Sequence, residues 1–236
     1  MKPDLSNGGG IKMFLVDLIF PSRCPFCDKV IPYDRLCCER CFDECKWSDE
    51  NICRYCGKSV LRGCLCDEVT YDECVCAAYY SGNARKAIRN LKYRHEGAGA
   101  VVFGRVLHDM LIERDLLKSI DIAVPVPMYK GKLRERGYNQ AELIAREIVR
   151  NTDISIRNDL IYRDNPETEQ HLLGAEERRK AAFSQYHAAK AELDGETILL
   201  IDDVLTTGST FSACTDELRR IGAGKVICAA AVTAGE

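Results

Sequence analysis

The sequence predicts an α/β domain with a mainly parallel sheet covered by helices on both faces, preceded by a small cysteine-rich module. From residue 69 onward, short apolar runs typical of buried strands alternate with segments of helical periodicity. Before that point the pattern differs, because twelve of the fourteen cysteines lie between Cys24 and Cys76. We therefore expect two units, residues 1–68 and residues 69–236.

The cysteines of the first unit form two quartets with zinc-ligand spacing. In each quartet, a Cys-x-x-Cys pair is followed by a second pair, and the expected ligands are Cys24, Cys27, Cys38 and Cys41, then Cys53, Cys56, Cys64 and Cys66. Two such turns supply the four thiolates of a tetrahedral structural site, so the spacing predicts one or two bound Zn²⁺ ions. Cys37 is an alternative to Cys38, since a slip of one residue would exchange them.

Disulfide bonds are the competing interpretation of these cysteines, and they require an oxidising compartment. The first residues lack a basic stretch followed by an apolar core and a small-residue cleavage site. We therefore expect zinc-bound thiolates and a cytoplasmic protein. The apolar residues 13–20 predict a short amphipathic helix, because they contain Asp17 and are too few to span a bilayer.

Four other cysteines are expected to be packed thiols rather than ligands. Cys74 and Cys76 alternate within a predicted strand, so both point to one face. Cys214 and Cys228 are isolated in the sequence.

The second unit is expected to alternate strands with helices. Strands are predicted at residues 75–80, 120–126, 160–162, 198–201 and 225–232, and helices at residues 84–93, 100–117, 138–148 and 211–221. Residues 128–137, between a strand and a helix, are predicted to form a loop.

A run of thirteen residues near the C-terminus, residues 198–210, predicts a phosphosugar site. A buried apolar strand ends in Asp202 and Asp203, at the edge where open α/β sheets bind ligands. The residues that follow offer backbone N–H groups and hydroxyls at a helix start, and they are Thr206, Thr207, Gly208, Ser209 and Thr210. Acidic turns and Ser/Thr caps also begin many ordinary helices. Their combination with the preceding strand favours two carboxylates that bind sugar hydroxyls and a loop that holds a phosphate.

Four cations, Lys130, Lys132, Arg134 and Arg136, crowd the predicted loop at residues 128–137. A run of charges is usually a solvated face. This loop, however, leaves the carboxyl end of another predicted core strand and can face the two acids. We therefore expect some of these cations to bind a diphosphate.

The order of motifs resembles the ComF family of competence-associated phosphoribosyltransferase-like proteins. The resemblance rests on Phe20-Pro-Ser-Arg-Cys-Pro-Phe-Cys27, on the other cysteine knuckles, on Ile88-Arg-Asn-Leu-Lys-Tyr93, on Val124-Pro-Val-Pro127 and on Arg136-Gly-Tyr-Asn-Gln140. The final motif, residues 198–208, is similar to the phosphoribosyl pyrophosphate (PRPP) loop of type I phosphoribosyltransferases.

The resemblance implies a type I phosphoribosyltransferase-like fold and a ligand, PRPP, bound together with Mg²⁺. It implies that Asp202 and Asp203 hold the ribose hydroxyls, that residues 206–210 hold the 5′-phosphate, and that Lys130, Arg134 and Arg136 lie in or near the pyrophosphate loop. It also implies that a segment from Thr168 through Gln170 and Arg178 to Phe183 covers the site; the Asn that usually follows the Arg is absent.

Two hypotheses of different classes follow. The first is an enzyme, a glycosyltransferase that transfers phosphoribosyl from PRPP to an acceptor and is linked to DNA uptake in natural transformation. The second is a non-catalytic PRPP sensor, or a protein that binds single-stranded DNA or competence proteins. The net charge of −3 gives no global nucleic-acid footprint. Local candidates for strand binding are a basic helix and scattered aromatics, namely Lys86, Arg89, Lys92 and Arg94 with Trp47, Tyr55, Tyr79, Tyr80 and Tyr93.

Overall fold

The computed structural model describes residues 5–6, 21–64, 66–93, 97–164 and 185–234. The predicted helix at residues 13–20 and the segment from Thr168 to Phe183 lie outside these ranges. Among the described residues, no helix has the length and apolar character needed to cross a membrane.

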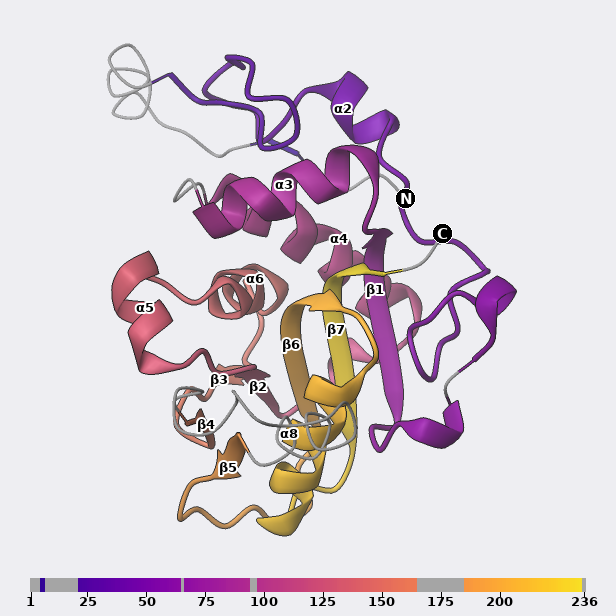
Figure 1. The fold of residues 1–236 in the computed structure, drawn as a ribbon, viewed down its shortest axis with the longest axis vertical. Helices are drawn as coiled ribbons and strands as arrows, with labels where there is room; N and C mark the ends of the chain where they lie inside the picture. Colours follow the sequence, from indigo (N-terminus) through magenta and orange to yellow (C-terminus); the bar gives the residue numbers. More distant parts are fainter. Residues whose placement is uncertain (1–4, 7–20, 65, 94–96, 165–184, 235–236) are drawn as a thin grey trace, which may run out of the picture.

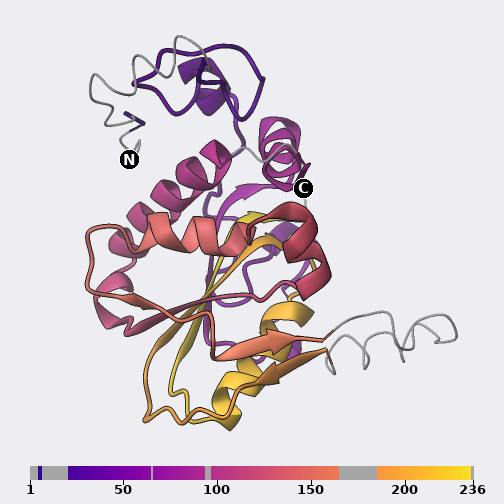
Figure 2. The same cartoon turned by 90° about the vertical axis from the view of Figure 1, so that its left-hand side faces the viewer.

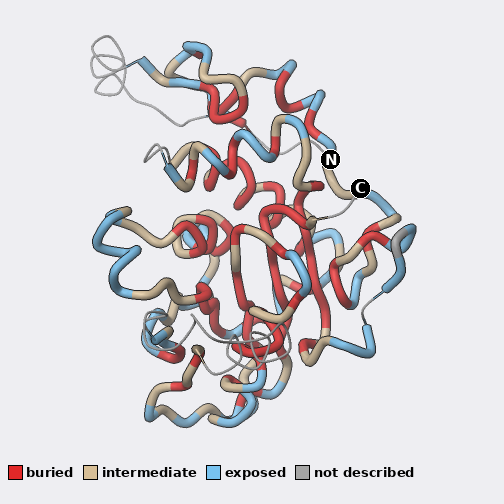
Figure 3. Tube along the Cα trace, in the orientation of Figure 1, coloured by how far each residue is buried: buried red, intermediate tan, exposed pale blue. Residues whose placement is uncertain are grey.

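Five parallel strands form the central sheet in the order β1-β7-β6-β2-β3 (Figure 1). The strands are β1 (Glu73–Tyr79), β2 (Ile122–Pro125), β3 (Ser155–Ile156), β6 (Ile198–Leu205) and β7 (Val226–Thr233). Every residue of β1, β2 and β7 is buried, which explains why their sequences are largely apolar (Figure 3). The prediction of a mainly parallel sheet is confirmed.

Helices cover both faces of this sheet and create two cores. The helices are α3 (Gly82–Tyr93), α4 (Ala98–Glu113), α6 (Gln140–Ile148) and α8 (Ser209–Arg220). The first three pack on one face, where Leu199 and Ile201 of β6 point, and α8 packs on the other, where Ile198 and Leu200 point. A short 3-10 helix (Leu117–Ser119) follows α4.

A two-stranded antiparallel hairpin, formed by β4 (Ile161–Arg163) and β5 (Tyr186–Ala188), stands apart from the main sheet. Figure 2 shows it extending away from the parallel strands. The strand β4 was predicted from the sequence, whereas β5 was not.

The prediction of a basic loop at residues 128–137 was wrong, because residues Lys130–Arg136 form a helix, α5. The helix starts after extended Tyr129 and ends at Gly137, which takes the left-handed conformation with φ of 77°. Seven residues are too few to show a clear apolar period, and most of these seven are charged, so no helical pattern was visible in the sequence.

The two cysteine quartets contact different parts of the α/β domain. The first quartet and α2 (Glu39–Asp43) lie over α3 and α4, where Phe26 and Trp47 meet the Phe103 ring edge-on at 6.2 and 6.1 Å. The second quartet, with short 3-10 helices at Val60–Arg62 and Cys66–Glu68, runs beside β1, and Ile52 and Tyr71 enter the core under α8. The division of the chain at residue 68 stays a prediction.

Candidate functional site

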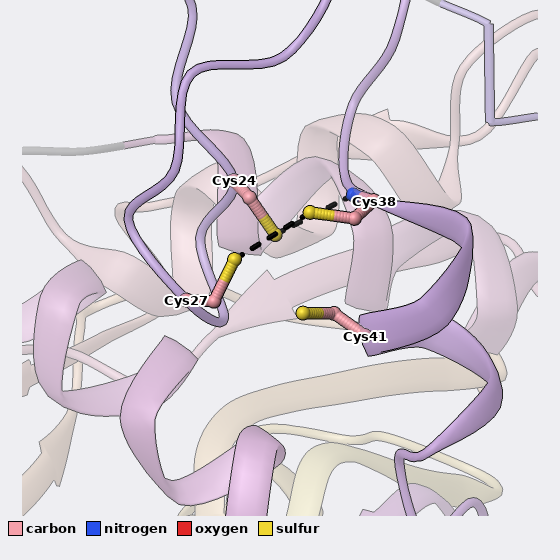
Figure 4. A group of neighbouring side chains, drawn as sticks. All are labelled: Cys24, Cys27, Cys38 and Cys41. Carbon is pink, nitrogen blue, oxygen red and sulfur yellow. Dashed lines mark hydrogen bonds between the residues drawn. The ribbon is translucent and has the colours of Figure 1, made fainter.

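The first cysteine quartet converges on one point. The sulfur atoms of Cys24, Cys27, Cys38 and Cys41 all lie within 4.8 Å of one another (Figure 4). The Sγ atoms of Cys27 and Cys38 are 3.5 Å apart, near the separation of about 3.8 Å that tetrahedral zinc with Zn–S bonds of about 2.3 Å requires. The quartet contains Cys38, whereas Cys37 is buried in the core, so the structure decides between these neighbours.

The second quartet has the same geometry in a more exposed setting. The sulfur atoms of Cys53, Cys56, Cys64 and Cys66 lie within 4.8 Å of one another, and Cys64 and Cys66 are exposed. Burial opposes ionisation of Cys53, but hydrogen bonds from the backbone of Cys56 and Tyr55 outweigh it and lower the pKa of the thiol to about 7. Both quartets fit structural Zn²⁺, whose ligands are thiolates, because each brings four sulfur atoms within 4.8 Å of one another.

The four cysteines predicted to be packed thiols are buried. Cys74, Cys76, Cys214 and Cys228 are buried, and the Sγ atoms of Cys74 and Cys76 are 3.9 Å apart on one face of β1. Burial raises the pKa of Cys214 and Cys228 well above the usual value for a thiol, so neither is a nucleophile at neutral pH.

Asp202 and Asp203 lie near the carboxyl end of β6 and point to opposite faces of the sheet. The strand continues through both residues to Leu205, because its pairing with β7 extends to Thr233. Asp203 is 10% exposed and forms an ion pair of 2.9 Å with Lys92 of α3. Asp202 lies on the side of α8 and the hairpin, and its Oδ1 accepts a hydrogen bond of 2.7 Å from the Asp203 backbone N–H. One acid therefore meets a cation from the helix layer, while the other is held by a backbone N–H group.

The environment of Asp202 disfavours its charged form. Burial, and then the neighbouring charge of Asp203, raise the pKa of Asp202 to about 7, although Lys92 and Arg163 act in the opposite direction. A positive charge that develops next to this carboxyl would stabilise its ionised form.

The loop after β6 is built to approach a ligand closely. Gly208 begins α8 in the left-handed conformation with φ of 84°, and a Cβ atom there would lie 2.8 Å from the Tyr71 hydroxyl oxygen. Only glycine fits without strain. The Thr207 and Ser209 hydroxyls are 2.9 Å apart and exposed or half-exposed, and the first turn of α8 adds N–H groups that have no acceptor within the helix. The loop thus presents hydroxyls and a positive helix end to one location.

A cleft of about 280 Å³ lies beside the two acids and brings cations from several elements around them. Its lining includes Asp202, Asp203 and Thr210, together with Lys132 and Arg136 of α5. Lys132 and Arg136 are four residues apart and share a helix face, whereas the exposed Lys130 and Arg134 fall on the other side and do not line the cleft. The Arg136 guanidinium also donates to Gln140 Oε1 at 2.9 Å, which fixes its direction.

The hairpin supplies two further lining residues, Arg163 and Tyr186. The Arg163 guanidinium lies 5.2 Å from the centre of the Tyr186 ring and donates to Gln185 Oε1 at 3.0 Å. Its buried Nε atom has no hydrogen-bond partner within the described part of the chain. Sequence reasoning missed both residues, because only tertiary pairing of β4 with β5 brings them to Asp202.

Lys92 also lines the cleft, and for this residue the sequence contained a usable signal. It sits in the Ile88–Tyr93 motif at the end of α3, and sequence reasoning assigned it to a nucleic-acid face. The structure turns it inward, 28% exposed, to Asp203. The signal was the place of Lys92 in the Ile88-Arg-Asn-Leu-Lys-Tyr93 motif, which the resemblance described above had already singled out.

Two segments of the chain match known domain families. Residues 15–70 match the double zinc ribbon domain, which contains both cysteine quartets. Residues 133–236 match the phosphoribosyl transferase domain, which contains Asp202, Asp203 and the loop that follows.

Similar proteins carry names related to DNA uptake and use. Competence protein F of Haemophilus influenzae is 36% identical over 113 residues, which are 47% of this chain and 49% of that protein. DNA utilization protein YhgH of Escherichia coli K12 is 27% identical over 155 residues, which are 64% of this chain and 68% of that protein. The match thus spans about half the length of Competence protein F and about two thirds of YhgH.

Solved structures with local similarity include two enzymes of phosphoribosyl metabolism. The purine phosphoribosyltransferase from Pyrococcus horikoshii aligns with 55% of this chain and 68% of its own, at 17% identity and a TM-score of 0.31. The phosphoribosylpyrophosphate synthetase from Mycobacterium smegmatis aligns with 56% of this chain and 33% of its own, at 17% identity and a TM-score of 0.34.

The parallel sheet with its acidic strand end agrees with the phosphoribosyltransferase domain match, and the two four-cysteine clusters agree with the double zinc ribbon match. These two domains in this order, together with the similarity to Competence protein F and YhgH, support the assignment of the chain to the ComF family.

Proposed function

We propose that the chain binds PRPP with Mg²⁺ in the cleft beside β6 and acts as a phosphoribosyltransferase. The observation that carries the proposal is the position of Asp202 and Asp203 between the glycine-containing loop and the cations of α3 and α5. These groups match the parts of PRPP. Carboxylates accept hydrogen bonds from the two ribose hydroxyls, the loop holds the 5′-phosphate, and cations face the diphosphate.

The proposed reaction displaces diphosphate from C1 of the ribose by an acceptor nucleophile. The C1–O bond breaks with its electron pair going to the diphosphate, and the acceptor forms the new bond to C1. Lys132 and Arg136 offset charge on the leaving group, and Asp202 and Asp203 orient the ring and stabilise positive charge that develops on it. Mg²⁺ bound with the diphosphate would neutralise part of the charge on the leaving group. Lys130 and Arg134 on the outer side of α5 add to the positive field at the entrance.

Calorimetric titration with Mg-PRPP tests the binding step, and pyrophosphate release over bases, nucleotides and single-stranded DNA tests turnover. Wild type should bind, and Arg136→Gln should weaken binding by about tenfold, since one charge-assisted hydrogen bond is lost. Arg146→Gln, on the exposed side of α6, is the matched control and should bind like wild type. Binding without release for every acceptor would replace the enzyme with a PRPP sensor, and no binding would refute the site.

A second function, binding of single-stranded DNA, is favoured by a neighbouring groove, which shares Tyr93 with the cleft and also includes Asp28. A cavity of about 500 Å³ between the first quartet and α3 is lined by Lys86, Arg89, Asn90 and Tyr93, and Tyr93 is 72% exposed. Cations beside an exposed ring suit a strand whose bases stack and whose phosphates pair with Lys or Arg. We propose that this groove connects the protein to DNA handling in the cytoplasm, as the names of its relatives suggest for them.

Fluorescence anisotropy with a labelled oligonucleotide over a series of salt concentrations tests this groove. Replacing Lys86 and Arg89 with glutamine should flatten the slope of log affinity against log salt by about 1.4, since each phosphate contact on a single strand contributes about 0.7. Lys118→Gln, on the far 3-10 helix, should not change the slope. An unchanged slope in the double variant would rule the groove out as the binding surface.

A further inference from the structure

The two Cys-x-x-Cys turns repeat each other in their backbone hydrogen bonds. The Cys24 N–H donates to the Lys29 carbonyl at 2.9 Å, and the Cys53 N–H donates to the Lys58 carbonyl at 2.8 Å. In both turns the residue after the second cysteine is left-handed, with φ of 65° in the first turn and 69° in the second. Lys29 and Lys58 are therefore equivalent residues of a duplicated structure.

These equivalent lysines have different surroundings. Lys29 is exposed, whereas Lys58 is half-buried between the ends of two core strands. The Lys58 ammonium donates a short hydrogen bond to the backbone carbonyl of Thr206, and another of 3.2 Å to that of Ala234. Thr206 begins the loop that follows β6, and Ala234 follows β7. One side chain of the second quartet thus ties the start of the phosphate-binding loop to the end of the neighbouring strand.

Further contacts join this turn to the same loop. A Cβ atom on Gly57 would lie 2.6 Å from the Leu205 side chain, so the turn packs directly on the end of β6. The Tyr71 hydroxyl donates to the Cys56 carbonyl at 3.0 Å. The same hydroxyl oxygen would lie 2.8 Å from a Cβ atom on Gly208, so Tyr71 packs against the loop there. The second quartet therefore supports the loop at Thr206 and again at Gly208.

We propose that Lys58 is a positioning residue for the loop at residues 206–210, and that metal binding at the second quartet and ligand binding at this loop are thermodynamically coupled. Lys58 holds its place only while the turn that contains Cys53 and Cys56 is closed, and metal binding supplies free energy for closing such turns. By linkage, a ligand that orders the loop increases metal affinity by the same factor as the metal increases ligand affinity. The ligand half of this statement rests on the proposed PRPP function.

The Ser212 N–H donates to the Gly208 carbonyl at 2.9 Å, and the Ala234 N–H donates to the Leu205 carbonyl at 2.7 Å. Hydrogen exchange of these two backbone amides, which flank the loop, measured on zinc-loaded protein without ligand, tests the positioning role directly. Lys58→Met should speed this exchange by about tenfold or more, because hydrogen bonds from a charged donor are lost. Lys29→Met, the equivalent change in the first turn, should leave it unchanged, and Lys58→Arg should restore most of the protection. Equal exchange in the Lys58→Met and Lys29→Met variants would overturn the proposal.

The coupling is tested by removing one ligand from each quartet in turn. Cys64→Ser should speed exchange of the Ser212 and Ala234 amides, whereas Cys38→Ser should not, and no difference between the two variants would overturn the coupling. Mg-PRPP affinity should fall about tenfold in Lys58→Met and stay unchanged in Lys29→Met. If wild type does not bind Mg-PRPP, the proposed function fails, while the exchange measurements still decide the role of Lys58.

Discussion

Replacing Lys92 with methionine removes the cation that pairs with Asp203 and keeps most of the apolar length of the side chain. The Nζ and Oδ2 atoms are 2.9 Å apart, and the two side chains are 28% and 10% exposed. The variant therefore leaves an almost buried carboxylate beside a second carboxyl, Asp202. We expect this uncompensated charge to dominate the effect on stability.

The size of the effect follows from the geometry. With an effective dielectric constant of about 20, two charges 2.9 Å apart attract by about 6 kcal/mol before the cost of desolvation is subtracted. Breaking a buried pair costs about 3 to 5 kcal/mol, and the partial exposure of Lys92 reduces this to about 2 kcal/mol. For a chain of this size, about 2 kcal/mol lowers Tm by about 4 to 8 °C.

Thermal unfolding of four proteins measures the contribution of the pair. They are wild type, Lys92→Met, Asp203→Asn and the double variant, and Lys86→Met on the exposed side of α3 is the control, expected to change Tm by less than about 2 °C. The double variant should lose less stability than the sum of the two single variants, because it leaves no charge without a partner. Additive losses, or equal Tm values for Lys92→Met and Lys86→Met, would refute this account of the pair.

Two further predictions concern the metal sites and the second acid. Purified wild type should contain two zinc ions per chain, Cys38→Ser one and Cys37→Ser two, by elemental analysis; equal zinc in both variants would contradict the assignment of Cys38 as ligand. Because the pKa of Asp202 is raised to about 7, its contribution to stability is present below the unfolded pKa of about 4 and lost as pH rises through about 7. At about 1.4 kcal/mol for each change of one in pKa, the free energy of unfolding of Asp202→Asn, relative to wild type, should rise by up to about 3 kcal/mol between pH 5 and pH 8. Parallel curves of Tm against pH for the two proteins would contradict this prediction.

Local patterns in the sequence predicted the parts of the site that one continuous segment supplies. The apolar residues 198–201, the two acids and the glycine-containing loop are consecutive, so strand, carboxyl edge and helix start could be read together. The same holds for the two quartets, whose ligand spacing is a local property of each knuckle.

Sequence reasoning failed where a residue's role depends on the three-dimensional arrangement. The four cations at residues 130–136 could not be separated into those inside and outside the cleft until α5 placed Lys132 and Arg136 on one face. Arg163 and Tyr186 reach Asp202 only through the β4–β5 pairing, across more than twenty residues of sequence.

The part played by Lys58 was equally hidden. Lys29 occupies the same position in an equivalent turn and remains exposed, so the two lysines differ in what lies beside them. Only the fold, which places the second quartet beside the ends of β6 and β7, separates a structural knuckle from one that contacts the ligand loop.

The affinity of Mg-PRPP for wild type and for the Asp202→Asn/Asp203→Asn variant, compared by calorimetry, tests the central claim most directly. Two charge-assisted hydrogen bonds to the ribose are lost, so affinity should fall at least about a hundredfold. Asp216→Asn, on the exposed side of α8, should bind like wild type. Equal affinity in wild type and the double variant would show that these two acids do not hold the ribose.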